Sequence, residues 1–268
     1  MQSIICFTSD FGMSDTWVGV CHAVIYRACP QARVVDLAHD IQPYDIRKAA
    51  AVAASGVWQL PEAIHLVAVD PGVGGGRRDL CVVTTQGTVL VGPDNGVLIP
   101  ATWRAGGISE AYAIEPQALT FRAPLATFHA RDVLAPAAAA LACGVEPGVV
   151  GATIDPCSLV EAPFQRCHTE GGLLMAEVID IDRFGSIRLG MALEDLDGFC
   201  GSDGLVEIAF ENIRLKVPLR ATFSDVAEGE PVALFDSSGW LTIAVRMGSA
   251  AERYSAGPGG MVRVGPCV

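Results

Sequence analysis

The sequence predicts an α/β fold with a mainly parallel sheet in the first half of the chain and an all-β barrel or sandwich in the second half. In the first half, buried strand-like runs alternate with helix-like segments, a pattern that gives right-handed crossovers and parallel strands. In the second half, short strand-like runs are separated by glycine-rich turns. We therefore expect an α/β domain at 1–155, a linker without clear periodicity at 156–170 and a β domain at 171–268.

Apolar patterning and turn residues define the expected N-terminal elements. The run 4–9 alternates little and predicts a buried strand. Thr16 is placed to cap the next helix, and Pro30 ends it. Gln86 and Gly87 mark the turn of a hairpin. The expected order is strand 4–9, helix 16–29, strand 32–37, a helix from Asp45 or Ile46 to Gln59, strand 64–69, strands 80–85 and 88–91, strand 111–114 and helix 133–142.

The expected C-terminal strands are short and come in pairs. Such pairs favour an antiparallel barrel or sandwich, because hairpins join neighbouring strands that run in opposite directions. The expected strands are 173–181, 186–189, 205–208, 213–217, 231–236, 240–245 and 261–264.

Composition limits the classes of partner. The 268 residues are 51% hydrophobic, enough for a sizeable core, yet no apolar run approaches the roughly 18 residues of a membrane span. The net charge of −12 argues against nucleic acid or an anionic membrane surface as the main partner. It suits a cationic small molecule, although solubility alone also explains it. The N-terminus lacks a basic region before its first apolar run, so we expect no signal peptide and a cytoplasmic protein.

The cysteine and histidine spacings indicate neither a disulfide frame nor a metal site. There are nine cysteines, an odd number, and none forms a C-x-x-C pair. We expect reduced thiols within apolar runs, as at Cys6, Cys21, Cys81 and Cys143. Four histidines without ligand spacing are expected to be structural or exposed: His22, His39, His65 and His168.

One stretch, 65–78, brings together residue types that are common in ligand-binding and catalytic sites. An apolar run ends at Asp70, a proline and four glycines follow, and Arg77 comes seven residues after the acid. Glycines at this density let the backbone approach a ligand. The carboxyl ends of parallel strands form a ligand-binding edge, where Asp10 and Asp36 would join Asp70. A strand-to-turn junction with a surface salt bridge is about equally compatible with this stretch alone.

His129 is the histidine best placed for chemistry. It precedes a predicted helix and stands in a polar group with Thr127, Arg131 and Asp132. A carboxylate, a guanidinium and an imidazole near one point can orient water and accept its proton. A hydrogen-bonded structural histidine is the alternative.

Motifs along nearly the whole chain resemble those of one family. They are Thr8-Ser-Asp10-Phe-Gly, Val35-Asp-Leu-Ala-His39, Val69-Asp70-Pro-Gly-Val-Gly with Arg77-Arg78, Gly92-Pro-Asp-Asn-Gly96, Thr127-Phe-His129-x-Arg-Asp132, Asp182-Arg-Phe184-Gly and Ser237-Ser-Gly-Trp-Leu. This ordered set is similar to the S-adenosyl-L-methionine (SAM) hydroxide adenosyltransferases, or SAM hydrolases, whose relatives are the fluorinases and chlorinases.

The resemblance implies a fold, an assembly and a reaction. The fold would be an α/β domain with a seven-stranded sheet followed by a β-barrel. The assembly would be a homotrimer with SAM bound between one subunit's N-terminal domain and its neighbour's C-terminal domain. Water would attack C5′ of SAM, giving adenosine and L-methionine. SAM would be the substrate, with no cofactor or metal, and neither nucleic acid nor membrane would be a partner.

The resemblance also implies residue roles. Asp70, Arg77 and His129 would be the catalytic triad that orients water, with Arg77 preferred to Arg78 by the family's spacing. Asp10 would accept hydrogen bonds from the ribose hydroxyls. The implied substrate-binding set is Asp10, Phe11, Asp15, Tyr44, Asn95, Phe128, Asp182, Phe184, Ser186, Phe223 and Ser237.

The chemistry agrees with this interpretation. A sulfonium cation favours an acidic pocket, and neutral methionine leaves without a general acid. A carboxylate and an imidazole suit water better than halide. The sequence departs from the usual family pattern at Ala130, Ser186 and 246–249. Two alternatives are therefore kept: a SAM- or adenosine-binding sensor without turnover, and, less favoured, a SAM-dependent halogenase.

Overall fold

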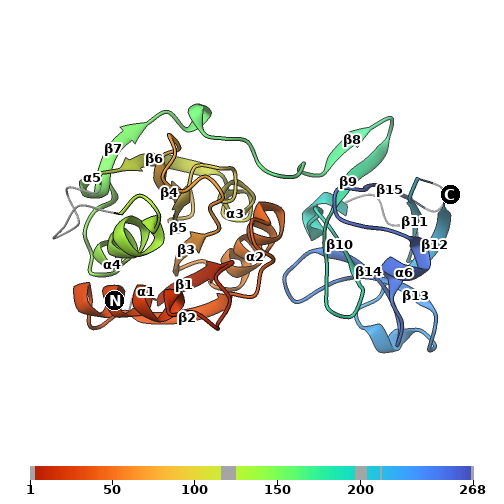
Figure 1. Ribbon diagram of the computed structural model, residues 1–268. Coiled ribbons are helices and arrows are strands. Elements are labelled where there is room, and N and C mark those ends of the chain that lie inside the picture. The colour runs from red at the N-terminus through yellow and green to blue at the C-terminus, as the bar shows by residue number, and fades with distance from the viewer. Residues whose placement is uncertain (1–3, 116–124, 197–203, 212, 267–268) are drawn as a thin grey trace. The chain divides into compact units, whose positions relative to one another are not determined.

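The computed structural model describes residues 4–115, 125–196, 204–211 and 213–266. The chain forms two compact units, Met1–Pro163 and Phe164–Val268. Figure 1 shows the helices gathered mainly in the first unit and the second unit built mainly of strands.

A seven-stranded sheet forms the centre of the first unit. Its strand order is β2-β1-β3-β5-β4-β6-β7, and five of the seven strands run in one direction while β4 and β7 run in the other. The prediction of a mainly parallel seven-stranded sheet is confirmed. The strands are β1 (Ile4–Ser9), β2 (Arg33–Ala38), β3 (Ile64–Ala68), β4 (Asp79–Thr84), β5 (Val89–Pro93), β6 (Ile108–Ile114) and β7 (Gly151–Ile154).

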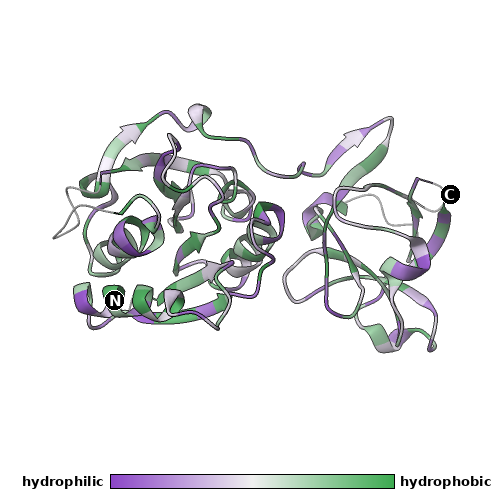
Figure 2. Cartoon of the chain, viewed as in Figure 1, coloured by the Kyte–Doolittle hydropathy of each residue, from purple (hydrophilic) through white to green (hydrophobic). Residues whose placement is uncertain are grey.

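Helices cover this sheet. Helix α1 packs against α4, α2 packs against α3, and the central strands between them are mainly hydrophobic (Figure 2). The Asp45 side chain accepts a hydrogen bond from the Lys48 backbone N–H at 2.9 Å, which explains why α2 begins there. Thr16 makes no such cap. The helices are α1 (Trp17–Ala28), α2 (Ile46–Gln59), α3 (Ile99–Trp103), the π-helix η2 (Ala130–Leu134), α4 (Ala135–Ala142), α5 (Pro147–Val150) and the 3-10 helix η3 (Pro156–Ser158).

The second unit is an antiparallel sheet that curls into a nearly closed barrel. The strand order is β12-β11-β15-β9-β10-β14-β13, with β8 paired to β9. A bridge between Leu219 and Ala233 links the two ends of this order. The prediction of a C-terminal barrel is confirmed. The strands are β8 (His168–Glu170), β9 (Leu173–Ile181), β10 (Ile187–Leu189), β11 (Leu205–Ala209), β12 (Arg214–Pro218), β13 (Pro231–Phe235), β14 (Leu241–Val245) and β15 (Met261–Pro266).

Short helices connect the strands of the second unit. The barrel interior is filled by aliphatic side chains of β9, β10, β11, β14 and β15, such as Ile187, Leu189 and Ile243. The helical segments are η4 (Leu193–Leu196), η5 (Phe223–Asp225) and α6 (Ala250–Tyr254). None of the helices in the described parts of the chain has both the length and the apolar character needed to cross a membrane.

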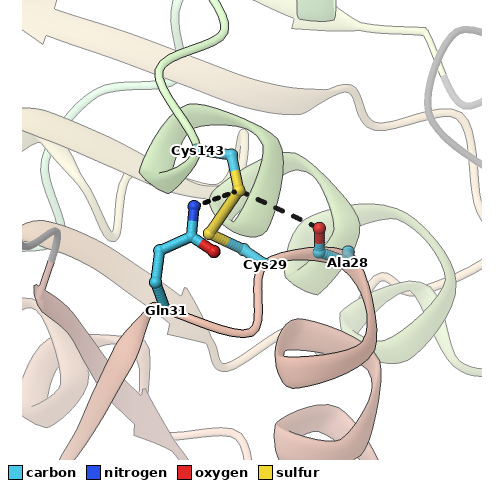
Figure 3. Close-up of a disulfide and its surroundings, with 4 residues drawn as sticks. All are labelled: Ala28, Cys29, Gln31 and Cys143. Carbon is cyan, nitrogen blue, oxygen red and sulfur yellow. Dashed lines mark hydrogen bonds between the residues drawn. A yellow bond between two sulfur atoms is a disulfide. The ribbon is translucent and has the colours of Figure 1, made fainter.

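One cysteine prediction is wrong. Cys143 is exposed and forms a disulfide with Cys29, joining the end of α4 to the end of α1 (Figure 3). The two cysteines are 114 residues apart, so their spacing gave no sign of the pairing. Cys6, Cys21 and Cys81 are buried free thiols, as predicted, and burial raises the pKa of Cys6 to about 11.

Candidate active site

The catalytic candidates meet at one edge of the seven-stranded sheet. Parallel strands β1 and β3 end there, and Asp10 and Asp70 follow them. Strand β4 runs in the opposite direction, so its first residues return to the same edge. Arg77 and Asp79 lie at this start of β4. The topology therefore brings three acids and a guanidinium to one place.

A glycine keeps the loop between β3 and β4 close to the His129 segment. Gly74 has φ of +78°, and a Cβ atom there would collide with the backbone oxygen of Ala126. Only glycine meets both conditions without strain. The glycine-rich sequence thus lets two loops that are distant in the chain touch beside Asp70.

Arg77 joins two carboxylates, the half-buried Asp70 and the buried Asp79. Its Nε donates to Asp70 Oδ1 at 3.0 Å, its Nη2 donates to Asp70 Oδ2, and its Nη1 donates to Asp79 Oδ1. Burial by itself would lower the pKa of Arg77, but the hydrogen bond to Asp70 and the charges of both acids outweigh burial and raise it. Arg77 is therefore a fixed cation. Arg78 instead pairs with Asp94, so the structure separates the two arginines.

His129 completes the cluster. It is the residue before η2, and its Nδ1 lies 2.8 Å from Asp79 Oδ2 and 3.2 Å from Arg77 Nη2. Sequence reasoning missed Asp79. A signal was present, because residues two apart in extended backbone face the same side, and Asp79 stands two after Arg77.

A cleft of about 680 Å³ opens over this cluster. Its acids are Asp10 and Asp70, and edge-to-face aromatic contacts shape it, with Phe11 and Phe128 centred 5.8 Å apart. Acidic groups and aromatic faces together suit a cation that carries flat rings. The lining residues are Asp10, Phe11, Trp17, Pro43, Tyr44, Ala68, Asp70, Val73, Leu125, Thr127, Phe128, His129, Ala130, Arg131 and Leu134.

Tyr44 reaches the cleft through an uncommon backbone conformation. Its φ is +72°, and its backbone N–H donates to Asp10 Oδ2 at 2.9 Å. Non-glycine residues in this region cost energy and often occur at binding sites. This hydrogen bond holds the loop that carries Tyr44 next to Asp10, so these two predicted binding residues lie side by side.

Other predicted residues of the first unit lie outside the cleft lining. The Asn95 side-chain amide donates to the backbone oxygen of Val69 at 3.0 Å, which holds the strand end that carries Asp70. Asp15 is exposed in the loop before α1. Asp36 does not join Asp10 and Asp70 in lining the cleft, contrary to expectation; it contacts His22 and His39 at 2.8 and 2.9 Å.

In the second unit, the Asp182 carboxylate organises a tight turn. Its Oδ1 accepts the backbone N–H groups of Phe184 and Ser186 at 2.8 and 2.9 Å. Ser186 is buried, whereas the Phe184 side chain is 80% exposed. An exposed ring on a rigid turn is available to a binding partner.

Two further predicted residues of the second unit lie on separate loops. Phe223 begins η5 and is largely exposed. Ser237 is exposed in the turn between β13 and β14, which Asp236 fixes by accepting the Ser238 N–H at 2.8 Å. Arg188 donates to Asp236 Oδ2 at 2.6 Å and thereby anchors that turn.

Metal binding finds no support in the described residues. Across residues 4–115, 125–196, 204–211 and 213–266, no group of three or more His, Cys, Asp or Glu side chains is arranged to hold an ion.

These features define a two-unit protein, with one α/β unit that carries an acidic aromatic cleft and one β-barrel unit. The protein-family model of the SAM hydroxide adenosyltransferase N-terminal domain matches residues 5–151, and that of the C-terminal domain matches residues 176–263. The chain belongs to the SAM hydroxide adenosyltransferase family.

Individual relatives agree with this family. A protein named (R)-S-adenosyl-L-methionine hydrolase from Salinispora tropica is 38% identical over 97% of both chains. One of the same name from Thermus thermophilus is 39% identical, covering 97% of this chain and 98% of its own. A Thermotoga maritima crystal structure of an uncharacterized conserved protein has a TM-score of 0.87 at 31% identity, covering 97% of this chain and 99% of its own. Fluorinases are more distant, as at 27% identity for Actinopolyspora mzabensis over 98% of this chain and 97% of its own.

Proposed function

We propose that this enzyme hydrolyses SAM to adenosine and L-methionine, with water attacking C5′ of the ribose. The observation that carries the proposal is the Asp70–Arg77–His129 cluster at the base of an acidic aromatic cleft. The identities of 38% and 39% to two proteins named SAM hydrolase, against 27% to a fluorinase, support water over halide as the nucleophile.

The cleft accounts for recognition of the nucleoside. Asp10 and Asp70 provide negative charge for the sulfonium, and Asp10 Oδ1 can accept from the ribose hydroxyls while Oδ2 holds the Tyr44 N–H. Tyr44 and Phe128 flank the nucleoside, and Phe11 supports Phe128 edge-on. Aromatic faces of this kind bind cations and flat rings.

The cluster accounts for the chemical step. Asp70, held by Arg77 through two hydrogen bonds, and His129 orient one water molecule behind C5′. As the O–C5′ bond forms, the C5′–S bond breaks and its electron pair stays on the methionine sulfur. The water proton passes to the cluster. The leaving group is neutral, so no general acid, metal or cofactor is required, and alignment supplies most of the acceleration.

Most of the remaining predicted binding residues belong to the second unit. In this proposal the protein is a cytoplasmic homotrimer, and a neighbouring subunit's barrel closes each cleft. Asp182 and Ser237 bind the methionine amine and carboxylate, while Phe184, Ser186 and Phe223 border the adenine. Asp15 and Asn95 support the N-terminal side. The rigid turns at Asp182 and Asp236 fit such a role, because their side chains are already held in place.

The test is a SAM incubation in ¹⁸O-labelled water with chromatography and mass spectrometry. Adenosine carrying ¹⁸O at the 5′ position is expected, and Asp70→Asn and His129→Ala should abolish most of it. Glu62→Gln and His168→Ala change exposed residues and serve as matched controls. Intact SAM retained over hours without adenosine would instead indicate a sensor. A 5′-chloro product in chloride would indicate a halogenase.

A further inference from the structure

We infer that Asp79 is a positioning residue that fixes the tautomer of His129, so that Nδ1 carries the proton and Nε2 presents its lone pair to water. The inference rests on the proposed function for its kinetic consequence, but its structural content stands on the contacts of three side chains. None of the family motifs identified in the sequence contains Asp79.

Asp79 lies behind the cluster and not in the cleft. Its side chain is 7% exposed, and it is absent from the cleft lining while His129 and Asp70 belong to it. One carboxylate oxygen accepts from Arg77 Nη1 and the other faces His129 Nδ1 at 2.8 Å. Asp79 therefore contacts Arg77 and His129 from outside the cleft, where it would not touch a ligand.

The contacts decide which ring nitrogen bears the proton. Arg77 and Asp79 both approach Nδ1, the cation at 3.2 Å and the carboxylate at 2.8 Å. An unprotonated Nδ1 would place its lone pair against a carboxylate lone pair at the shorter distance. Arg77 Nη2 already donates to Asp70 Oδ2, so it does not need Nδ1 as an acceptor. The Nδ1–H tautomer satisfies Asp79, and Nε2 is left as the base.

The backbone makes this arrangement rigid. Asp79 is the first residue of β4 and pairs with Pro93 of β5, so the sheet fixes its position. His129 is fixed independently as the residue that precedes η2. A carboxylate and an imidazole held by separate elements have little freedom to change partners, which is what a catalytic base requires.

The charge balance gives Asp79 a second effect during the reaction. When Nε2 accepts the water proton, the ring becomes an imidazolium beside the Arg77 cation. Asp70 alone would then face two positive charges. Asp79 supplies the second negative charge, at hydrogen-bond distance from both cations, and so stabilises the protonated ring as the O–C5′ bond forms.

Asp79→Asn is the most informative substitution because it keeps the shape and changes the hydrogen-bond pattern. The amide oxygen should face cationic Arg77, which leaves the amide NH₂ facing Nδ1. His129 would then accept at Nδ1 and carry its proton on Nε2, the wrong tautomer for a base. A comparable carboxylate-to-amide change behind a catalytic histidine lowers kcat about 10⁴-fold in serine proteases, and we expect about 10²- to 10⁴-fold here.

The experiment combines kinetics with ¹⁵N NMR of histidine-labelled protein. The chain has five histidines, and His129→Asn identifies the His129 resonances. The wild type should show Nδ1–H for His129, and Asp79→Asn should show Nε2–H, with kcat reduced and KM within about threefold because Asp79 touches no substrate. Asp94→Asn is the matched control, since it alters a buried acid that pairs with Arg78 and not with His129.

The outcomes separate this inference from the proposed function. An Nε2–H tautomer in the wild type, or an Asp79→Asn variant with wild-type kcat and an unchanged tautomer, would overturn the role of Asp79. A wild type that forms no adenosine would overturn the proposed function, while the NMR comparison would still test Asp79. If Asp79→Asn fails to fold, the tautomer of the wild type remains the test: Nδ1–H on His129 supports the role of Asp79, and Nε2–H overturns it.

Discussion

Two adjacent arginines immediately before β4 form ion pairs with acids, yet only one of them belongs to a candidate active site. Arg77 binds Asp70 and Asp79 beside His129 and the cleft. Arg78 binds Asp94 and reaches the hydroxyl of Ser158 at 2.9 Å, tying η3 to the sheet. The chemical groups are the same, but the surroundings differ.

The comparison shows what turns an ion pair into a site. The Arg77 cluster holds an imidazole that lines a cleft, and among the described residues only its Nδ1 has hydrogen-bond partners. At the Arg78 cluster, the Asp94 carboxylate also accepts the Val160 N–H at 2.9 Å. Both of its oxygens therefore hold structural hydrogen bonds, one to Arg78 and one to Val160. A catalytic group needs a hydrogen-bonding atom that is free to meet substrate at an open surface. A stabilising ion pair is instead buried, with its hydrogen-bonding atoms already satisfied.

The largest effect should come from Arg77→Met. Without the cation, the buried Asp79 is left without a positive partner and the half-buried Asp70 loses its own, a loss of about 3 kcal/mol in the free energy of unfolding. Asp70, the carboxylate proposed to orient water, also loses the hydrogen bonds that fix its position, so kcat should fall at least about 10²-fold. Chemical denaturation and adenosine release measure the two losses. A variant with normal kcat would contradict the assignment of this cluster to catalysis.

Arg78→Met should separate stability from activity. Asp94 is buried and would lose its cation, while retaining the Val160 N–H, so the free energy of unfolding should fall by about 2 kcal/mol. The expected kcat stays within about twofold, because no contact joins this pair to His129. The same two measurements apply. A kcat loss equal to that of Arg77→Met would erase the difference between the two clusters.

Gly74→Ala tests the loop that brings the Arg77 cluster together. The positive φ and the collision with the Ala126 oxygen should cost about 1–3 kcal/mol, and the displaced loop should lower kcat about tenfold. Gly76→Ala is the matched control, because a Cβ there meets nothing within 4 Å. Equal behaviour of the two alanine variants in denaturation and turnover would show that the close approach is unimportant.

Much of the active cluster followed from local sequence. Glycines between Asp70 and Arg77 allow the chain to return within seven residues, and the polar group around His129 interrupts an apolar region. Local patterns of this kind report backbone geometry directly. The choice between Arg77 and Arg78 did not follow from local sequence, because neighbours in an extended strand point to opposite sides and either could face Asp70. The family spacing decided it.

The features that sequence reasoning missed depend on distant contacts. The spacing from Arg77 places Asp79 on the same side as that arginine, but its contact with His129, fifty residues later, is visible only in the fold. Strands β7 and β8 were missed because they are three or four residues long and mostly exposed, which leaves no hydrophobic alternation to detect. The Cys29–Cys143 pair joins two helix ends that only the packing of α1 on α4 brings together.

Asp36 extends the comparison to a carboxylate shared by imidazoles instead of a guanidinium. Burial alone would raise its pKa, but hydrogen bonds from His39 and His22 outweigh burial and lower it below the ordinary 3.8. The ionised form is thus favoured by folding, so its contribution to stability is present above pH 3.8 and is lost as the pH falls through the lowered value. Because the side chain is about one-third exposed, Asp36→Asn should cost under about 1 kcal/mol at pH 7. Urea denaturation of both proteins from pH 7 to pH 3 should show this difference shrinking at the acidic end, and a constant difference would mean that charge plays no part in this third cluster.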